Sequence, residues 1–554
     1  MKASEFSSRL LSSLCKVLPG CAPTGRAVDR VEGLWGETVS FQLAFTATAS
    51  QRDLRENVVR VEVQSPLAQR VRVRSVVNVP VLLPVCGEGD DDYISKQPGM
   101  YPDLLRVLPA VSLRAVPGQW RALWFDITLD EILTLPEYPL VLHVFGADGA
   151  LLARHSLTVG VVPAALPPQA LIHTQWFHGD CLADYYGVEV FSERHWAIME
   201  NFIREAAEHG INMLLTPLFT PPLDTGEGRE RTTIQLVDVH CGQGVYSFDF
   251  SRLARFVDMA ERCGIRYFEM AHLFTQWGAA YAPKILVWED GALRKKFGWH
   301  TPAMGPDYRA FLRAFLPALT AFFKDRGMAD RVYFHLSDEP ELRHLDAYRA
   351  AADFVRPLLA GCKTLDALSD YEFYRTGCVE RPVVASDHLE PFLAHGVKGL
   401  WTYYCIVQNR EVANRFIAMP SARSRILGVQ LYLYDIEGFL QWGYNFYNTQ
   451  HSTALVDPYS CTDGGDAFPA GDPYLVYPGR DGMPEESIRL MTTCEALFDL
   501  RALRLLEALR GRAFVDALLH EGLAYRITFT QYPRGEEWLL DMRRRVNGAL
   551  RAAL

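Results

Sequence analysis

The sequence lacks the features that identify membrane proteins and disulfide-bonded secreted proteins. No stretch of its 554 residues approaches the roughly 20 consecutive apolar residues that span a bilayer, so we predict no contact with a membrane. The first twenty residues lack the continuous apolar segment of a secretion signal, and we expect a cytoplasmic protein. The eleven cysteines follow no CxxC or regular spacing, which predicts reduced thiols.

Motifs for cofactors, metals and common nucleophiles are also missing. There is no HExxH and no GxSxG, and GQG at 242–244 is too short a pattern to predict nucleotide binding. His178, His272 and His388 could form a metal site with Asp180 or Asp387, but their spacing matches no metal motif. We therefore expect no cofactor and no metal.

The balance of charge excludes another class of partner. The formal net charge is −10 and no long Lys/Arg run occurs, so the sequence offers no basic surface for nucleic acid. The 49% apolar and 12% aromatic content is typical of a globular protein with large cores. A folded enzyme with a neutral substrate fits this composition, and a homo-oligomer stays open.

The first 165 residues predict an all-β sandwich. Alternating apolar and polar residues at 38–47, 59–64 and 138–146 are separated by Gly, Pro and Asp clusters, as in antiparallel strands. Residues 161–170 contain three prolines, which resist both helix and central strand, so this segment is the expected linker. The predicted domains are therefore 1–165 and 166–554.

The second domain alternates short apolar strands with amphipathic helices, which predicts a (β/α)8 TIM-type barrel followed by a C-terminal helical segment. An open doubly wound sheet is the alternative, disfavoured because no Gly-rich phosphate loop follows the first strand. The expected helices include 251–264, 341–361 and 484–511. The expected strands are 171–178, 211–218, 265–274, 331–339, 364–370, 382–389 and 400–407, with an eighth near 427–435, where a helix is also possible.

In such a barrel the active site lies at the C-terminal ends of the strands, so polar residues that end an apolar run are candidates. For Asp370 and Asp387 a helix cap or loop salt bridge is an equally good interpretation. The candidates are His178, Asp180, Thr216, His272, Asp338, Glu339, Asp370, Asp387, His388, Tyr403 and Tyr404.

The most informative segment is HLSDEP, residues 335–340, where two carboxylates follow an apolar strand. Like charges so close resist joint ionisation, so one pKa should rise toward the range of a general acid. Paired acids at a barrel rim indicate glycoside cleavage, which needs a proton donor at the leaving oxygen. Both Asp338 and Glu339 can reach one substrate only if the strand ends or bends between them, and Pro340 favours that ending.

Two further segments accompany HLSDEP (335–340), namely WGETVSFQLAF (35–45) and YLVYPGRDGMPEESIRL (474–490). Together the three segments resemble glycoside hydrolase family 123 and the related domain-of-unknown-function 4091 group, and the resemblance spans most of the chain. It implies a retaining N-acetyl-β-galactosaminidase in which the substrate's own acetamido oxygen attacks C1. Asp338 would then polarise the acetamido N–H, and Glu339 would act first as general acid and then as base.

Aromatic residues late in the barrel could stack on a sugar ring. Tyr404 and Trp442 are the preferred contacts, with Tyr403 or Tyr444 available to bind the acetamido carbonyl. His178, His272 and Asp387 complete the expected substrate-binding set.

The resemblance therefore implies hydrolysis of a terminal 2-acetamido-2-deoxy-β-hexoside, with the galacto configuration expected and the gluco configuration open. The partner is an oligosaccharide or glycoconjugate. One alternative keeps Glu339 as acid and uses Glu269 or Asp387 as nucleophile on another sugar. The other is a catalytically silent carbohydrate-binding protein.

Overall fold

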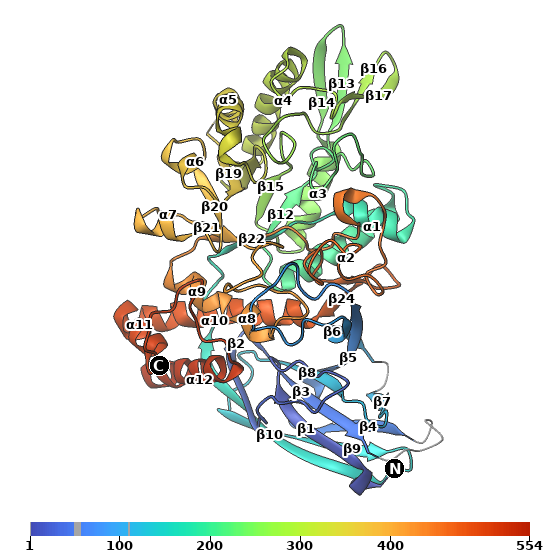
Figure 1. The fold of residues 1–554 in the computed structure, drawn as a ribbon, viewed down its shortest axis with the longest axis vertical. Coiled ribbons are helices and arrows are strands. Elements are labelled where there is room, and N and C mark those ends of the chain that lie inside the picture. The colour runs from blue at the N-terminus through green and yellow to red at the C-terminus, as the bar shows by residue number, and fades with distance from the viewer. Residues whose placement is uncertain (1, 49–56, 109–110, 360) are drawn as a thin grey trace.

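A computed structural model describes residues 2–48, 57–108, 111–359 and 361–554. Figure 1 shows an elongated molecule, with the N-terminal strands at one end and the barrel with its helices toward the other. The C-terminal helices lie between these two parts. None of the helices in the described ranges is both long and apolar enough to cross a bilayer. All eleven cysteines lie in these ranges and are free.

Two β-sheets form the N-terminal part. The strands of the seven-stranded sheet are, in order, β1 (Phe6–Ser12), β3 (Thr38–Ala47), β8 (Arg121–Thr128), β5 (Val71–Val81), β6 (Gly99–Val107), β24 (Pro484–Ser487) and β23 (Tyr477–Pro478). Those of the five-stranded sheet are β2 (Arg30–Trp35), β10 (Leu151–Ala165), β9 (Glu137–Gly146), β4 (Val58–Gln64) and β7 (Ser112–Arg114). Alternate residues of both sheets, such as Phe41 and Leu142, are buried in one core, so the predicted strands are confirmed.

The expected linker at 161–170 is partly wrong, because β10 continues to Ala165 and includes Pro163. The register between β10 and β2 shifts between Val162 and Ala165, and a proline is tolerated at such an irregularity because no regular ladder bond is lost. Strands β23 and β24 extend the first sheet although they follow the barrel in sequence. The domain boundary at residue 165 therefore stays a prediction.

Eight parallel strands close into a barrel, with β11 paired to β22. They are β11 (Ile172–Gln175), β12 (Met213–Thr216), β15 (Tyr267–Met270), β18 (Val332–His335), β19 (Lys363–Leu368), β20 (Arg381–Ala385), β21 (Trp401–Tyr403) and β22 (Gly438–Gln441). Seven coincide with predicted strands. The eighth was expected at 427–435, where the structure has a helix; Gly438 weakened the signal of the true strand. A side chain there would overlap the ring of Trp401, which fills that space.

Helices and a small extra sheet connect the strands. The helices are α1 (Gly179–Tyr186), α2 (Glu193–Glu208), α3 (Ser251–Arg262), α4 (Pro306–Asp325), α5 (Leu345–Val355), α6 (Glu372–Arg375), α7 (Glu390–Ala394), α8 (Ser421–Arg425) and α9 (Leu427–Leu433). The extra sheet has the order β14 (Val245–Asp249), β13 (Asp238–Gly242), β16 (Ile285–Glu289) and β17 (Ala292–Phe297). It belongs to the connections that follow β12 and β15.

Helix α10 (Ile488–Arg510) joins the two parts, because it packs on α8 and α9 and also on β6 and β24 (Figure 1). The sequence predicted a helix over 484–511, but its first four residues form β24, and Ser487 then caps α10 by accepting a hydrogen bond from the Leu490 amide. Helices α11 (Arg512–His520) and α12 (Glu536–Ala553) complete the chain.

The contact between α9 and α10 depends on Gly428, and we expect Gly428→Ala to destabilise the protein. A methyl group there would overlap the carbonyl oxygen of Ala496, so the helices must separate, at a cost of about 1–3 kcal/mol or more. Gly548→Ala in α12 is the matched control: beyond its chain neighbours and its own helix backbone, no atom of the described residues lies within 4 Å of the added carbon, and alanine should raise stability by about 0.5–1 kcal/mol. Denaturant unfolding measures both variants, and equal stabilities would contradict the close contact.

Candidate active site

A cavity opens at the C-terminal ends of the barrel strands. The Asp338 and Glu339 carboxylates line it beside residues that follow five other strands. These are Trp176 and His178 after β11, Leu223 and Asp224 after β12, Gln276 and Trp277 after β15, Cys405 and Ile406 after β21, and Trp442 after β22. The cavity therefore lies where the barrel geometry predicts an active site.

The backbone turns sharply at the carboxylate pair. Strand β18 ends at His335, three residues before Asp338, so the strand ends earlier than the predicted point between the two carboxylates. Glu339 has a φ of 43°, a left-handed conformation that is strained for a glutamate. Its amide donates to the Ala367 carbonyl at 3.2 Å, and the Asp338 carbonyl accepts from the Trp277 amide at 2.9 Å. This turn allows two adjacent side chains to face one cavity.

Both carboxyl groups have raised pKa values. Burial raises the pKa of Asp338 well above its ordinary value, and the neighbouring Glu339 charge raises it further. Burial also raises the pKa of Glu339, although a hydrogen bond from the Tyr403 hydroxyl, 2.6 Å from Oε1, opposes this change. The pair can therefore carry a proton at higher pH than isolated carboxylates do.

Tyr403→Phe should move the alkaline limb of the kcat/KM profile to higher pH. The Tyr403 hydroxyl stabilises ionised Glu339, so its removal raises the pKa of the acid. A hydrogen bond to a charged group contributes about 1.5–3 kcal/mol, which corresponds to a shift of about 1–2 pH units. Tyr404→Phe is the control, because the Tyr404 hydroxyl is buried without a hydrogen bond in the described residues. Similar profiles for both variants would contradict the role of Tyr403.

A buried charged layer lies beneath the pair. The His335 ring donates to Glu269 through Nε2 and to Asp366 through Nδ1 at 3.1 Å. Burial opposes the charge of His335, but the two carboxylates outweigh it and raise the His335 pKa to about 10. Asp366 also accepts from the amides of Leu336 and Ser337 at 3.1 and 3.2 Å. Asp366 therefore fixes the chain that leads to Asp338 and Glu339.

The structure brings three of the predicted binding residues to the cavity, namely His178, Tyr403 and Trp442. Both ring nitrogens of His178 are already engaged: Nδ1 with the Arg231 guanidinium at 3.1 Å and Nε2 with the Trp442 carbonyl at 3.0 Å. Burial and Arg231 lower its pKa to about 3, so it is a neutral positioning group. Trp442 donates from Nε1 to Asp472 at 2.9 Å, which fixes its ring.

Four predicted binding residues do not line the cavity. Tyr404 follows Tyr403 directly, so it points away, and its ring packs on Phe439. Tyr444 is buried and donates to the Phe202 carbonyl at 2.9 Å. The other two have contacts elsewhere: His272 stacks on His335, while Asp387 accepts from Gln408 at 2.9 Å.

The remaining polar strand-end residues have structural contacts. Asp180 forms a two-pronged ion pair with Arg231 at 2.8 and 2.9 Å. Asp370 accepts from the Glu372 amide at 2.9 Å, beside the start of α6, where Tyr371 and not Asp370 holds the N-cap position. Buried Thr216 donates to the Leu214 carbonyl, and His388 pairs with Asp387 at 2.7 Å.

Several cavity residues were missed because they lie in connections rather than at strand ends. Asp224 and Trp277 have φ values of 40° and 58°, conformations that no sequence pattern predicted. The Gln276 side chain accepts from the Asp224 amide at 2.8 Å, whereas its Nε2 has no partner in the described residues. Trp277 lines the cavity and is 46% exposed. Its occurrence as a single tryptophan in a connection was the one sequence feature that could have indicated a binding residue here.

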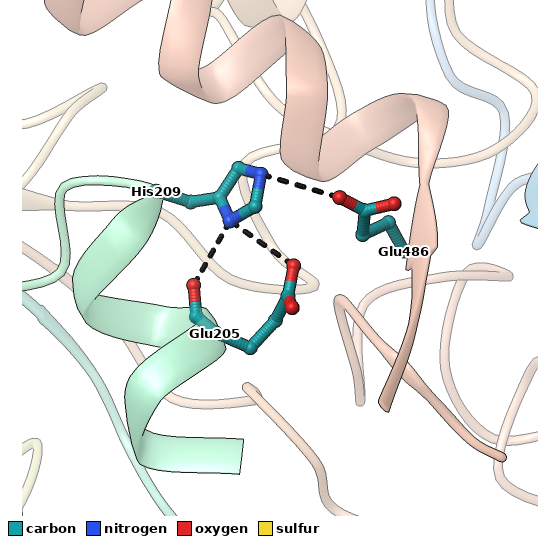
Figure 2. Close-up of side chains that lie close together, drawn as sticks. All are labelled: Glu205, His209 and Glu486. Atoms are coloured by element: carbon teal, nitrogen blue, oxygen red, sulfur yellow. Dashed lines mark hydrogen bonds and ion pairs between the residues drawn. The ribbon is translucent and has the colours of Figure 1, made fainter. Parts of the chain in front are cut away.

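One cluster has the residue types of a metal site, but arginines already neutralise one of its carboxylates. His209, which follows α2, lies between Glu205 and Glu486 of β24, as Figure 2 shows. Its Nδ1 lies 3.1 Å from the Glu205 carboxylate and its Nε2 lies 3.6 Å from that of Glu486. Glu486 is already paired with Arg72 at 2.8 Å and with buried Arg74. We interpret the cluster as a polar contact between barrel and sandwich.

Comparisons with known proteins agree with this architecture. The structure superimposes on a family 123 glycoside hydrolase from Clostridium perfringens, described for glycolipid glycan hydrolysis, with a TM-score of 0.72 and 14% identity, covering 99% of this chain and 98% of that one. A β-glucuronidase from Parabacteroides merdae matches at a TM-score of 0.31 and 11% identity, over 88% of this chain and 51% of that one. A family 5 mannosidase from Rhizomucor miehei also reaches 0.31, at 14% identity, over 60% of this chain and 93% of that one.

The latter two scores are too low to support an argument. No curated protein matches the sequence. The family model described as the catalytic domain of glycoside hydrolase 123 matches residues 176–506, more than half of the chain, and includes the carboxylate pair. The chain therefore belongs to glycoside hydrolase family 123.

Proposed function

We propose that the protein hydrolyses terminal N-acetyl-β-D-galactosaminides by a substrate-assisted, retaining mechanism. The observation that carries this proposal is the placement of two adjacent carboxyl groups, Asp338 and Glu339, in one cavity by a strained turn. Retaining enzymes with a carboxylate nucleophile place their two carboxyl groups on either side of the glycosidic bond, about 5 Å or more apart, whereas these two follow one another on a single turn. A nucleophile from the substrate itself removes this difficulty.

In the first step Glu339 donates its proton to the leaving oxygen while the acetamido carbonyl oxygen attacks C1. The C1–oxygen bond breaks and an oxazolinium ion forms. Ionised Asp338 accepts a hydrogen bond from the acetamido N–H and stabilises the positive charge. In the second step the Glu339 carboxylate takes a proton from water. The water attacks C1 from the face opposite the acetamido oxygen, and the bond between C1 and that oxygen breaks, which opens the oxazolinium ring and leaves the sugar ring closed. The raised pKa of Glu339, the group that gives and then takes the proton, supports this exchange.

The aromatic residues support binding of a sugar ring. Trp442 is held by Asp472 and packs between Phe446 and Phe468, with ring centroids 5.1 and 5.2 Å away. We propose that Trp442 and Trp277 contact the apolar face of the sugar. The Gln276 Nε2, which has no hydrogen-bond partner among the described residues, is available to a substrate oxygen.

The alternative mechanism uses an enzyme carboxylate as the nucleophile, but neither of the two residues predicted for this role lines the cavity. Glu269 lies below the cavity and already accepts from Thr174, Trp176 and His335. Asp387 is engaged by Gln408 and His388. A silent carbohydrate-binding protein would have no need for two protonatable groups at a strained turn.

Release of p-nitrophenol from the β-linked N-acetylgalactosaminide and N-acetylglucosaminide tests the proposal. We expect turnover of the galacto substrate and inhibition by an oxazoline-mimicking thiazoline. Because the Clostridium perfringens relative is described for glycolipid glycans, the oligosaccharide of a glycolipid should be assayed beside them. Covalent trapping by a fluorosugar would overturn the mechanism, and binding without turnover would favour the silent protein.

A further inference from the structure

A second hollow lies beside the catalytic cavity, between the barrel rim and the sandwich. It has a volume of about 430 Å³, within the range of small-molecule sites. Its walls include Gly87 and Glu88, from the segment after β5, and Ile406, Val407, Asn409 and Arg410, from the connection after β21. Ile406 also lines the catalytic cavity, so one side chain borders both spaces.

The two walls are held together by several bonds. Asn409 donates to the Cys86 carbonyl at 2.8 Å, and its own carbonyl accepts from the Tyr93 hydroxyl at 2.9 Å. The Glu411 amide donates to Asp90 at 2.7 Å, and Asp90 is in turn paired with buried Arg423. The groove is therefore built from fixed elements, and a fixed site loses little entropy when a ligand binds.

The chemistry of the groove suits a sugar. Val407 is 64% exposed and, with Ile406, offers an aliphatic surface to the C–H face of a pyranose. Arg410 and Glu88 form an exposed ion pair at 2.7 Å, which contributes little to stability and leaves further donors and acceptors free for hydroxyl groups.

The position of the groove indicates which part of the substrate it meets. Cys405, which precedes Ile406, has its sulfur 4.0 Å from Glu339 Oε1. The groove thus begins on the side of the cavity that holds the general acid, and a general acid must lie beside the leaving oxygen.

We propose that this groove is the leaving-group subsite, which binds the sugar that follows the scissile bond. The inference rests on the proposed glycosidase function and adds a role for the N-terminal sandwich, which supplies one wall. The substrate would then be an oligosaccharide rather than a simple glycoside.

The test compares two substrates that share the terminal sugar. N-acetyl-β-galactosaminyl fluoride has a leaving group too small to occupy the groove, whereas a disaccharide with a β-linked reducing-end hexose would fill it. The variants are the double change Glu88→Ala with Arg410→Ala, and Val407→Asp. For each, the ratio of kcat/KM for the disaccharide to that for the fluoride should fall about tenfold, as expected for one or two lost contacts.

Arg526→Ala is the matched control, because it removes another exposed ion pair, with Asp516 at 2.7 Å, and should leave the ratio unchanged. Thermal unfolding verifies that every variant is folded. Wild type that cleaves both substrates, with groove variants that keep the wild-type ratio, would overturn the subsite while the proposed function stands. Wild type that cleaves neither substrate would overturn the proposed function, and the subsite with it.

Discussion

Glu339→Gln is expected to lower kcat/KM for an unactivated disaccharide by about 10²–10⁴, the usual contribution of a general acid. Glutamine keeps the size of the side chain and can still accept from Tyr403, so the geometry should survive. The variant also removes one of two neighbouring buried charges, and we expect a melting temperature at least equal to that of wild type. Steady-state kinetics and thermal unfolding measure the two effects.

The leaving group separates the roles of the two carboxylates. The 2,4-dinitrophenolate of a 2,4-dinitrophenyl glycoside leaves without being protonated. Glu339→Gln should therefore lose much less activity on this substrate than on the disaccharide. Asp338→Asn should lose a similar factor on both substrates, because Asp338 acts on the acetamido group and not on the leaving oxygen. Equal losses for Glu339→Gln on both substrates would contradict its assignment as the acid.

Sequence reasoning selected a carboxylate pair that lines the cavity, because strand period and charge are local properties. The apolar run before Asp338 predicted a strand, and two adjacent carboxylates at its end were chemically unusual. The same reasoning selected Tyr404 and Tyr444, because aromatic density does not reveal which residues face the cavity. A register difference of one residue separates Tyr403, which binds Glu339, from Tyr404, which packs on Phe439.

The cavity wall formed by the connections could not be predicted in the same way. Asp224, Gln276 and Trp277 reach the cavity through irregular chain, where no periodic signal exists. The contact of the sandwich segment around Cys86 with Asn409 joins residues more than 300 positions apart, and a single sequence carries no information on such pairing. The eighth strand was misplaced because Gly438 makes room for Trp401 and so weakens the strand pattern.

The largest expected effect on stability is that of His335→Gln. The charged ring of His335 lies between Glu269 and Asp366, and its removal leaves two buried carboxylates without a cation, at a cost of about 3–5 kcal/mol. His272→Gln is the matched control: its ring stacks on His335 at 4.4 Å but has no hydrogen bond in the described residues. We expect the control to lose no more than about 1–2 kcal/mol. Denaturant unfolding near pH 6.5 compares them, and equal losses would contradict the charged layer.

The dependence on pH tests the charge of His335 directly. Its pKa is raised from 6.5 to about 10, so its ion pairs stabilise the folded protein fully below pH 6.5, and this stability is lost as the pH rises through 10. The stability difference between wild type and His335→Gln should therefore narrow from pH 6.5 to 10. The difference for His272→Gln should stay constant, because burial holds the pKa of His272 well below 6.5. A constant difference for both variants would show that His335 is neutral.

The same charge connects the buried layer to catalysis. Burial and the Glu339 charge raise the pKa of Asp338, whereas the His335 charge lowers it. His335→Gln should therefore raise the pKa of Asp338 and move the acid limb of kcat/KM to higher pH, because Asp338 must be ionised to hold the acetamido group. A purely structural role for His335 would lower activity without moving this limb, so the position of the limb decides between the two.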